Sequence, residues 1–133
     1  MGARKTTDLW VITPNELGAL AKLTMPFKTN NINIESFVCW EEKNNAHFRL
    51  VTSNNKKAKE LCTQAGYTVK EEPIILWTTS NAPGRLNAAT TALAEAKINT
   101  SCTYACSTGP GETTVAFYTN NPDRTREILN KLG

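Results

Sequence analysis

Apolar and polar positions follow two different periods along this chain, and their succession predicts strands and helices in a regular order. Short apolar runs at 9–13 and 74–79 are bounded by polar turn residues, which is typical of buried strands. After each run, apolar residues recur at helical spacing. They are Leu17, Leu20, Leu23 and Phe27 after the first run, and Leu86, Ala89, Leu93 and Ala96 after the second. Each run therefore predicts a strand that leads into an amphipathic helix.

A hairpin and a second helix are predicted after each of these helices. The turn residues Lys43-Asn44-Asn45 and Gly109-Pro110-Gly111 indicate hairpins. The predicted hairpin strands are 33–40 with 46–52, and 99–107 with 112–119. The predicted second helices are 56–65, which ends at Gly66, and 122–132, with Asn121 as its cap. An alternating run at 67–72 predicts one more strand, in the first half only.

The chain also contains an internal repeat. When the sequence is aligned with itself so that Asn15 falls on Asn81, several further segments match without gaps. Asn15-Glu16-Leu17-Gly18 then falls on Asn81-Ala82-Pro83-Gly84. We therefore predict two units, 8–72 and 73–133, each in the order βαββαβ. Right-handed crossovers make each an α+β, ferredoxin-like unit with an antiparallel sheet and helices on one face. The last strand of the second unit is absent or comes from elsewhere.

Three local features sharpen this prediction. Asn81 is expected to cap the second unit's first helix, with Pro83 in the first turn. Pro26 is expected to kink or shorten the first unit's helix, because it cannot donate to the carbonyl of Lys22. The absent last strand leaves 74–79 without a neighbour, and exposed edges tend to be paired. The first unit's final strand or a second copy could cover that edge, so we predict a homodimer.

The Asn-x-Pro-Gly turn carries a family resemblance. Asn81-Ala82-Pro83-Gly84-Arg85-Leu86, followed by a helix that ends at Ile98-Asn99, resembles the ACT domain. The first unit is a looser copy, with Leu17 where the family usually has Pro. The resemblance covers nearly the whole chain and implies a free-standing tandem ACT protein. It implies a non-catalytic regulatory module that binds a small amino acid between paired domains and has no cofactor.

The residues themselves are compatible with such a ligand. The first N–H groups of a helix carry partial positive charge and suit a carboxylate. Side-chain amides offer both donors and acceptors. Two half-equivalent sites are expected, one at Asn15–Gly18 facing Asn99 and one at Asn81–Gly84 facing Asn33. The second is favoured because Arg85 could pair with a carboxylate. The candidate ligand-binding residues are Asn81, Ala82, Pro83, Gly84, Arg85, Asn33, Ile34, Asn15, Leu17, Gly18 and Asn99.

Composition and charge exclude several other classes of protein. The formal net charge of +3 is too mild to favour nucleic acid, and no apolar run approaches a membrane span. Without an export signal, the four cysteines are expected to be reduced, and a cytoplasmic location is expected. No metal site is expected, because Cys102 and Cys106 are too far apart along one strand to share an ion. His47 is interpreted as a satisfied surface histidine near Cys39. The three tryptophans are interpreted as core and interface residues.

Three other functions share this order of elements or fit it. An RNA-binding module is disfavoured, because the third strands lack the Gly-aromatic pattern that stacks bases. A small acylphosphatase-like enzyme is disfavoured, because Pro14-Asn15-Glu16 offers no arginine and no glycine-rich loop. A regulatory or assembly subunit that docks on a partner metabolic enzyme, without a ligand of its own, remains the main alternative to an amino-acid sensor.

Overall fold

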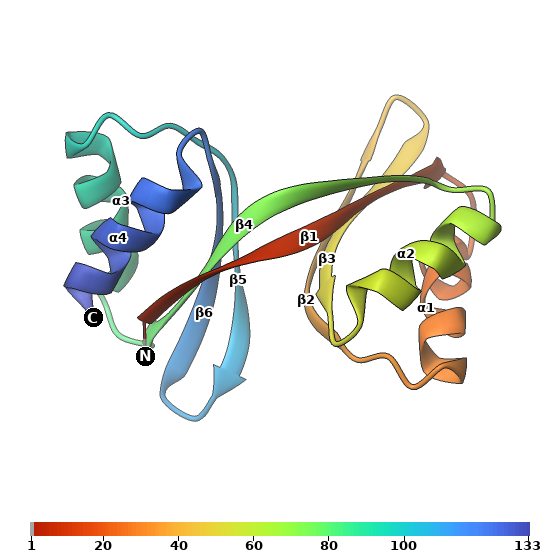
Figure 1. Ribbon diagram of the computed structural model, residues 1–133, viewed down its shortest axis with the longest axis horizontal. Helices are drawn as coiled ribbons and strands as arrows, with labels where there is room; N and C mark the ends of the chain where they lie inside the picture. The colour runs from red at the N-terminus through yellow and green to blue at the C-terminus, as the bar shows by residue number, and fades with distance from the viewer. Residues whose placement is uncertain (1) are drawn as a thin grey trace. The chain divides into compact units, whose positions relative to one another are not determined.

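A computed structural model of the protein describes residues 2–133, without the side chains of residues 107 and 108. Strands and helices alternate in the predicted order (Figure 1). They are β1 (Gly2–Pro14), α1 (Ala19–Thr29), β2 (Ile34–Glu42), β3 (Asn45–Thr52), α2 (Asn55–Gln64), β4 (Thr68–Ser80), α3 (Arg85–Glu95), β5 (Thr100–Gly109), β6 (Glu112–Thr119) and α4 (Pro122–Leu132). None of the helices in this described part is long and apolar enough to cross a membrane.

The chain divides into two compact units. The first unit is Thr7–Glu72, and the second unit combines Pro73–Gly133 with residues 2–6. The strand order is β2-β3-β1-β4 in the first unit and β1-β4-β6-β5 in the second, because β1 and β4 each contribute to both. Each unit is an antiparallel sheet with two helices, so the predicted pair of ferredoxin-like units is confirmed.

Two strands are longer than the sequence predicted. β1 begins at Gly2 instead of Leu9, and β4 joins the two predicted strands 67–72 and 74–79 through Pro73. No strand follows α4 within the described residues 2–133, but residues 2–6 lie beside β4 in the second unit. The N-terminus therefore supplies the strand that the repeat leaves out. Neither source that the sequence suggested was right, and the exposed edge that motivated the homodimer is covered within the chain.

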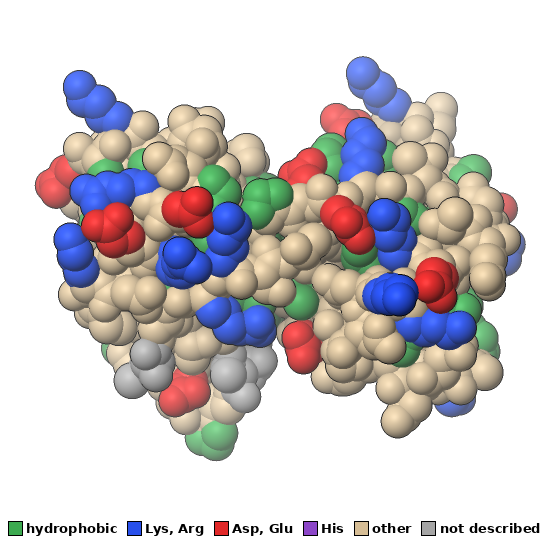
Figure 2. Space-filling model, viewed as in Figure 1, with side chains coloured by type: hydrophobic (Ala, Val, Ile, Leu, Met, Phe, Trp, Pro, Cys, Tyr) green, Lys and Arg blue, Asp and Glu red, His purple; other side chains and the backbone are tan. Residues whose placement is uncertain are grey.

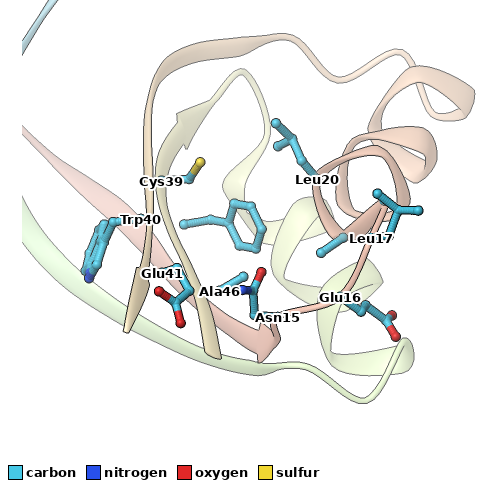
Figure 3. Close-up of a pocket in the computed structure, with 11 residues that line it drawn as sticks. Asn15, Glu16, Leu17, Leu20, Cys39, Trp40, Glu41 and Ala46 are labelled. Carbon is cyan, nitrogen blue, oxygen red and sulfur yellow. The ribbon is translucent and has the colours of Figure 1, made fainter. Parts of the chain in front are cut away.

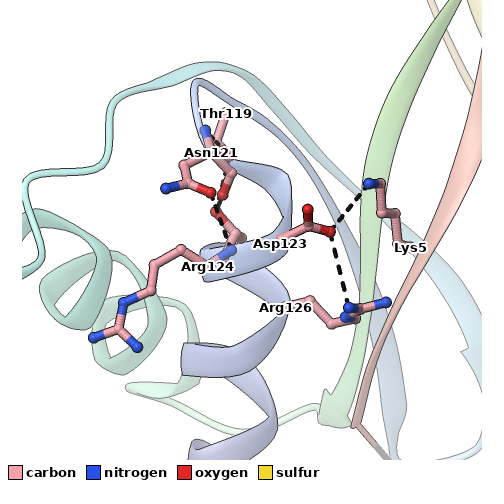
Figure 4. A network of polar contacts seen from close by, with 7 residues as sticks. Lys5, Thr119, Asn121, Asp123, Arg124 and Arg126 are labelled. Atoms are coloured by element: carbon pink, nitrogen blue, oxygen red, sulfur yellow. Dashed lines mark hydrogen bonds and ion pairs between the residues drawn. The ribbon is translucent and has the colours of Figure 1, made fainter.

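Polar contacts fix this N-terminal strand to α4. Ala3 N–H donates to Asn130 Oδ1 at 2.8 Å, and Asn130 Nδ2 donates to the Ala3 carbonyl at 3.2 Å. Lys5 Nζ lies 3.0 Å from Asp123 Oδ1, and Arg126 Nη2 lies 3.8 Å from the same oxygen (Figure 4). The hydrogen bond and the charge of Lys5 hold the pKa of Asp123 below its ordinary value.

Each unit has its own hydrophobic core, between its sheet and its two helices. The two cores place their bulk on different strands. In the first unit Val11 on β1 faces Phe48 on β3. At the equivalent pair of the second unit Trp77 on β4 faces Val115 on β6. In both pairs a small residue faces a large one. The large side chain comes from the hairpin strand β3 in the first unit and from β4 in the second, so the two cores are filled from opposite sides of the pair.

Pro26 does not shorten α1, which was one of the two effects that the sequence predicted, and the predicted kink stays a prediction. α1 and α3 have 11 residues each and begin and end at equivalent positions of the repeat. Leu23 and Phe27, which flank Pro26, are both 1% exposed. Burial of these two side chains outweighs the one backbone hydrogen bond that proline removes. The predicted cap of α4 is confirmed, since Asn121 Oδ1 accepts from Arg124 N–H at 3.2 Å.

Candidate functional site

The two Asn-x-x-Gly turns have the same backbone geometry. Gly18 and Gly84 are the N-caps of α1 and α3, with φ of 82° and 87°. Glycine adopts this left-handed conformation without the steric cost that a β-carbon brings. Neither cap residue offers a side-chain hydrogen bond to its helix. The prediction that Asn81 caps the helix is therefore wrong, because the chain makes one more turn before α3 begins.

The asparagines tie each turn to the neighbouring hairpin instead. Asn15 N–H donates to the Asn44 carbonyl at 2.9 Å, and Asn81 N–H donates to the Gly111 carbonyl at the same distance. Asn44 and Gly111 both lie in hairpin turns, after β2 and β5 respectively. Each helix N-terminus is thus anchored beside the hairpin of its own unit, and in both units a pocket lies there.

The pocket of the first unit is mainly apolar. It has a volume of about 550 Å³ and lies between the start of α1 and strands β2 and β3 (Figure 3). Glu16 lies at this pocket, but its carboxylate pairs with Lys22 Nζ at 2.8 Å and raises the pKa of that amine. Leu17 is fully exposed, and Leu20 is 41% exposed. The lining residues are Asn15, Glu16, Leu17, Gly18, Ala19, Leu20, Cys39, Trp40, Glu41, Ala46 and Phe48.

The pocket of the second unit is smaller and contains an arginine. It has a volume of about 290 Å³, and Asn81, Ala82 and Arg85 line it together with residues of β4, β5 and β6. Arg85 Nε donates to Thr79 Oγ1 at 2.8 Å, and Nη2 donates to the Gly133 carbonyl oxygen at 2.8 Å. The guanidinium also lies 5.4 Å from the centre of the Trp77 ring. Arg85 is therefore held in one position before any ligand arrives.

Asn33 and Asn99 lie at the far end of their own sheets from these turns. Asn33 N–H donates to Ser53 Oγ at 2.9 Å, where β2 begins and β3 ends. Asn99 N–H donates to Asn120 Oδ1 at 3.1 Å, at the equivalent place of the second unit. Both side chains are exposed. The pairing of each turn with an asparagine of the other unit stays a prediction.

The remaining candidate residues lie in three places. Leu17 and Gly18 join Asn15 at the first pocket, while Ile34 packs against the first core. Pro83 and Gly84 are exposed at the turn that leads into α3. The sequence analysis missed Thr79 and interpreted Trp77 as a core and interface residue, although both also line the second pocket. Strand alternation could have indicated this, because Trp77 and Thr79 share one face of β4 immediately before Asn81.

His47 differs from its prediction in two ways. It is buried at 8% exposure, and Trp10 Nε1 donates to its Nδ1 at 3.1 Å. The residue opposite His47 is Trp40, and Cys39 lies opposite Phe48. The reason is the two-residue turn at Lys43 and Asn44, whose positive φ values of 51° and 64° close the hairpin one position later than assumed. The expected contact of His47 with Cys39 is therefore wrong.

Other reactive groups do not converge on either pocket. Within residues 2–133, the described His, Cys, Asp and Glu side chains form no cluster of three that could hold a metal ion. Burial raises the pKa of the Cys62 thiol to about 11, so this thiol stays protonated at neutral pH. Lys and Arg side chains are interspersed with Asp and Glu on the face drawn in Figure 2, and they form no separate basic patch on that face.

Comparisons with known proteins add to this geometry. A family model described as an ACT domain pair matches residues 5–133. A solved structure of a protein from Bacteroides thetaiotaomicron is similar over 98% of this chain and 90% of its own, with 20% identity and a TM-score of 0.89. The comparison with curated proteins finds no match.

Two further solved structures are regulatory subunits of aspartate kinase. The Thermus thermophilus subunit, in its ligand-free form, has 11% identity and a TM-score of 0.68, and the match covers 98% of this chain and 96% of that one. The Thermus flavus subunit has 13% identity and a TM-score of 0.58, with coverage of 98% and 94%. At these identities the likeness shows a shared fold.

Proposed function

The chain belongs to the family of ACT domain pairs, and from this premise we propose that it is a non-catalytic regulatory protein that binds a small amino acid at the turn Asn81–Gly84. The solved structures of similar fold include regulatory subunits of aspartate kinase. That likeness supports a regulatory role. The nature of the ligand and its place are our proposal, argued from the second unit.

The observation that carries the proposal is the position of Arg85. Its side chain lines the second pocket, and Thr79 and the end of α4 fix it there. A fixed guanidinium beside the start of a helix suits a carboxylate, because both attract negative charge. The amide of Asn81 adds a donor and an acceptor to the same pocket. A small zwitterion would find partners for both of its charged groups among these side chains and the backbone.

A thermal-shift screen of the twenty amino acids tests the proposal. A ligand that binds only the folded state raises the melting temperature, and a hundredfold excess over Kd stabilises the fold by about 2.7 kcal/mol. We expect one or more amino acids to raise the midpoint of the wild type and of Gly18→Ala, but not that of Gly84→Ala. If no amino acid moves the wild-type midpoint, the sensor function is wrong.

A second candidate is an assembly subunit that docks on a partner metabolic enzyme. The observation that favours it is the exposed apolar surface of the first unit, where Leu17, Leu20 and Met25 are 103%, 41% and 57% exposed. Leu20 and Met25 belong to α1 and Leu17 to the turn before it, and exposed apolar side chains can mark an interaction surface. A Leu17→Ser, Leu20→Ser, Met25→Ser variant that still binds its amino acid but no longer co-purifies with an enzyme would assign this surface to docking.

A homodimer remains part of the proposal, on different grounds from those of the sequence. β2 and β5 stand at the two ends of the strand order, so each has one side without a strand of this chain. Strand edges of this kind readily pair with another chain. Sedimentation velocity at tens of micromolar should give a dimeric mass, and a monomeric mass would remove the dimer from the account.

A further inference from the structure

The two outer strands, β2 and β5, differ in how they are protected against pairing with another chain. Within residues 2–133, β2 pairs only with β3, and β5 pairs only with β6. The other side of each strand presents backbone N–H and C=O groups that no strand of this chain uses. Natural proteins protect such edges with charged side chains, proline or bulges, because an unprotected edge readily pairs with another chain. The side chains of the two strands therefore decide which edge is open to pairing.

β2 carries the protection that is expected of an outer strand. It contains Glu35 near its beginning and Glu41 and Glu42 at its end, and all three are exposed. When two copies of one strand pair antiparallel about a two-fold axis, the beginning of each strand faces the end of the other. Two copies of β2 would therefore bring carboxylates opposite one another, and like charges in that position are destabilising.

β5 lacks this protection along its whole length. Thr100–Gly109 contains no charged residue and no proline, and threonine and tyrosine within it favour strands. Its register against β6 shifts only near its two ends, so the middle of the strand, from Cys102 to Ser107, stays regular. Thr103 and Ala105 in this middle part are exposed. Two copies of β5 could pair without any conflict of charge.

We infer that the homodimer forms by antiparallel pairing of β5 with β5 of a second copy. This inference deepens the proposed homodimer and rests on it, because it names the edge that makes the contact. The same patch on both copies forms such an interface, which is the usual arrangement in two-fold dimers. Thr103, Tyr104 and Ala105 also line the second pocket, so the second copy lies beside that pocket.

Two substitutions at equivalent positions of the repeat test this choice of edge. Ala105 on β5 and Cys39 on β2 are both exposed, and each lies in the regular part of its strand. Ala105→Glu places a carboxylate on each copy near the two-fold axis and should raise the dissociation constant of the dimer about tenfold. Cys39→Glu should leave that constant unchanged. Ala105→Gln, which adds similar bulk without charge, should weaken the dimer less than Ala105→Glu does.

Sedimentation velocity over a range of protein concentrations measures the dissociation constants. The inference is overturned if Ala105→Glu dimerises as well as the wild type, or if Cys39→Glu weakens the dimer equally. If Ala105→Glu does not fold, amide hydrogen exchange of the wild type decides. Amides of β5 should then exchange more slowly at tens of micromolar than below one micromolar, while those of β2 keep their rates. Equal rates for β5 at both concentrations would also overturn the inference.

The outcomes separate this inference from the proposed homodimer. A wild type that is monomeric at tens of micromolar removes both. A dimer that survives Ala105→Glu leaves the homodimer standing and overturns the assignment to β5.

Discussion

The turn at Asn15–Gly18 and the turn at Asn81–Gly84 share one backbone but have different surroundings. Both helices begin at a left-handed glycine, and both turns are tied to a hairpin by an asparagine N–H. Beside the first turn lies an apolar pocket whose acidic neighbour Glu16 is already paired with a lysine. Beside the second lies a smaller pocket with a fixed arginine.

This difference separates two roles of the turn region, which are to begin the helix and to bind a ligand. The geometry of the turn is needed to begin the helix in both units, so its presence alone does not identify a binding site. Among the differences between the units, the change from Ala19 in the first to Arg85 in the second at equivalent positions bears most directly on a carboxylate. Both turns therefore serve folding, and the proposed carboxylate binding concerns the second turn alone.

The largest expected effect is the loss of unfolding free energy when the large core residue of each unit is truncated. Phe48→Ala and Trp77→Ala should each lower the free energy of unfolding by about 3–5 kcal/mol, because each leaves a large cavity. Val11→Ala and Val115→Ala, at the partner positions, should each cost about 2 kcal/mol, at roughly 0.8 kcal/mol per buried methylene. Urea unfolding of the four variants measures this. A greater loss from Val11→Ala than from Phe48→Ala would contradict the packing described.

The two glycines should respond alike in stability. Gly18→Ala and Gly84→Ala should each cost about 1–2 kcal/mol, because an added β-carbon disfavours positive φ. No atom lies within 4 Å of the position that either β-carbon would take, so no steric term should separate the two variants. Thermal and urea unfolding would measure both. A difference of more than about 1 kcal/mol between them would show that the turns are not equivalent.

A smaller difference in stability between the units is expected at the helix that holds the N-terminal strand. Asn130→Ala removes both hydrogen bonds from α4 to Ala3 and should cost about 1 kcal/mol. Thr63→Ala, at the equivalent position of α2, should stay within about 0.5 kcal/mol of the wild type, because this side chain is exposed. Amide hydrogen exchange provides the measurement. Residues 2–6 should exchange faster in Asn130→Ala only, and unchanged rates there would mean that other contacts hold the strand.

The smallest effect is the pH dependence that Lys5 confers through Asp123. The pKa of this carboxyl lies below its ordinary value of 3.8 in the folded protein, so the unfolded chain takes up its proton first as the pH falls. The free energy of unfolding should therefore decrease as the pH drops through 3.8 and further down to the folded-state pKa. In Lys5→Ala this decrease should be shallower. Urea midpoints measured from about pH 3 to pH 6 would show it, and parallel curves for the two proteins would refute it.

Much of the fold could be predicted because local pattern and tertiary structure agree. Helical spacing and hairpin turns placed the helices and the hairpins within a few residues of their observed bounds. Residues 2–6 could not be placed, because Gly2-Ala3-Arg4-Lys5-Thr6 has neither apolar alternation nor high strand propensity. This segment becomes a strand because β4 of the second unit offers an unpaired edge, which is a tertiary cause.

The candidate site was predictable to a similar degree. The repeat located both turns, and Arg85 indicated which of them suits a carboxylate. The roles of Thr79 and Trp77 depend on the register of β4 against β6 and on where the guanidinium comes to rest. Strand alternation indicates that Trp77 and Thr79 share a face, but a single sequence contains no signal for the position of the guanidinium.

The glycine amides of the two turns allow the most direct test of the central claim. The chain has seven glycines, so a ¹⁵N-glycine-labelled sample gives few resonances, and Gly18→Ala and Gly84→Ala assign the two of interest. In titrations with each of the twenty amino acids, the account predicts that at least one shifts the Gly84 resonance saturably and leaves the Gly18 resonance in place. If none shifts the Gly84 resonance, or if both resonances move alike, the assignment of ligand binding to the second unit is contradicted.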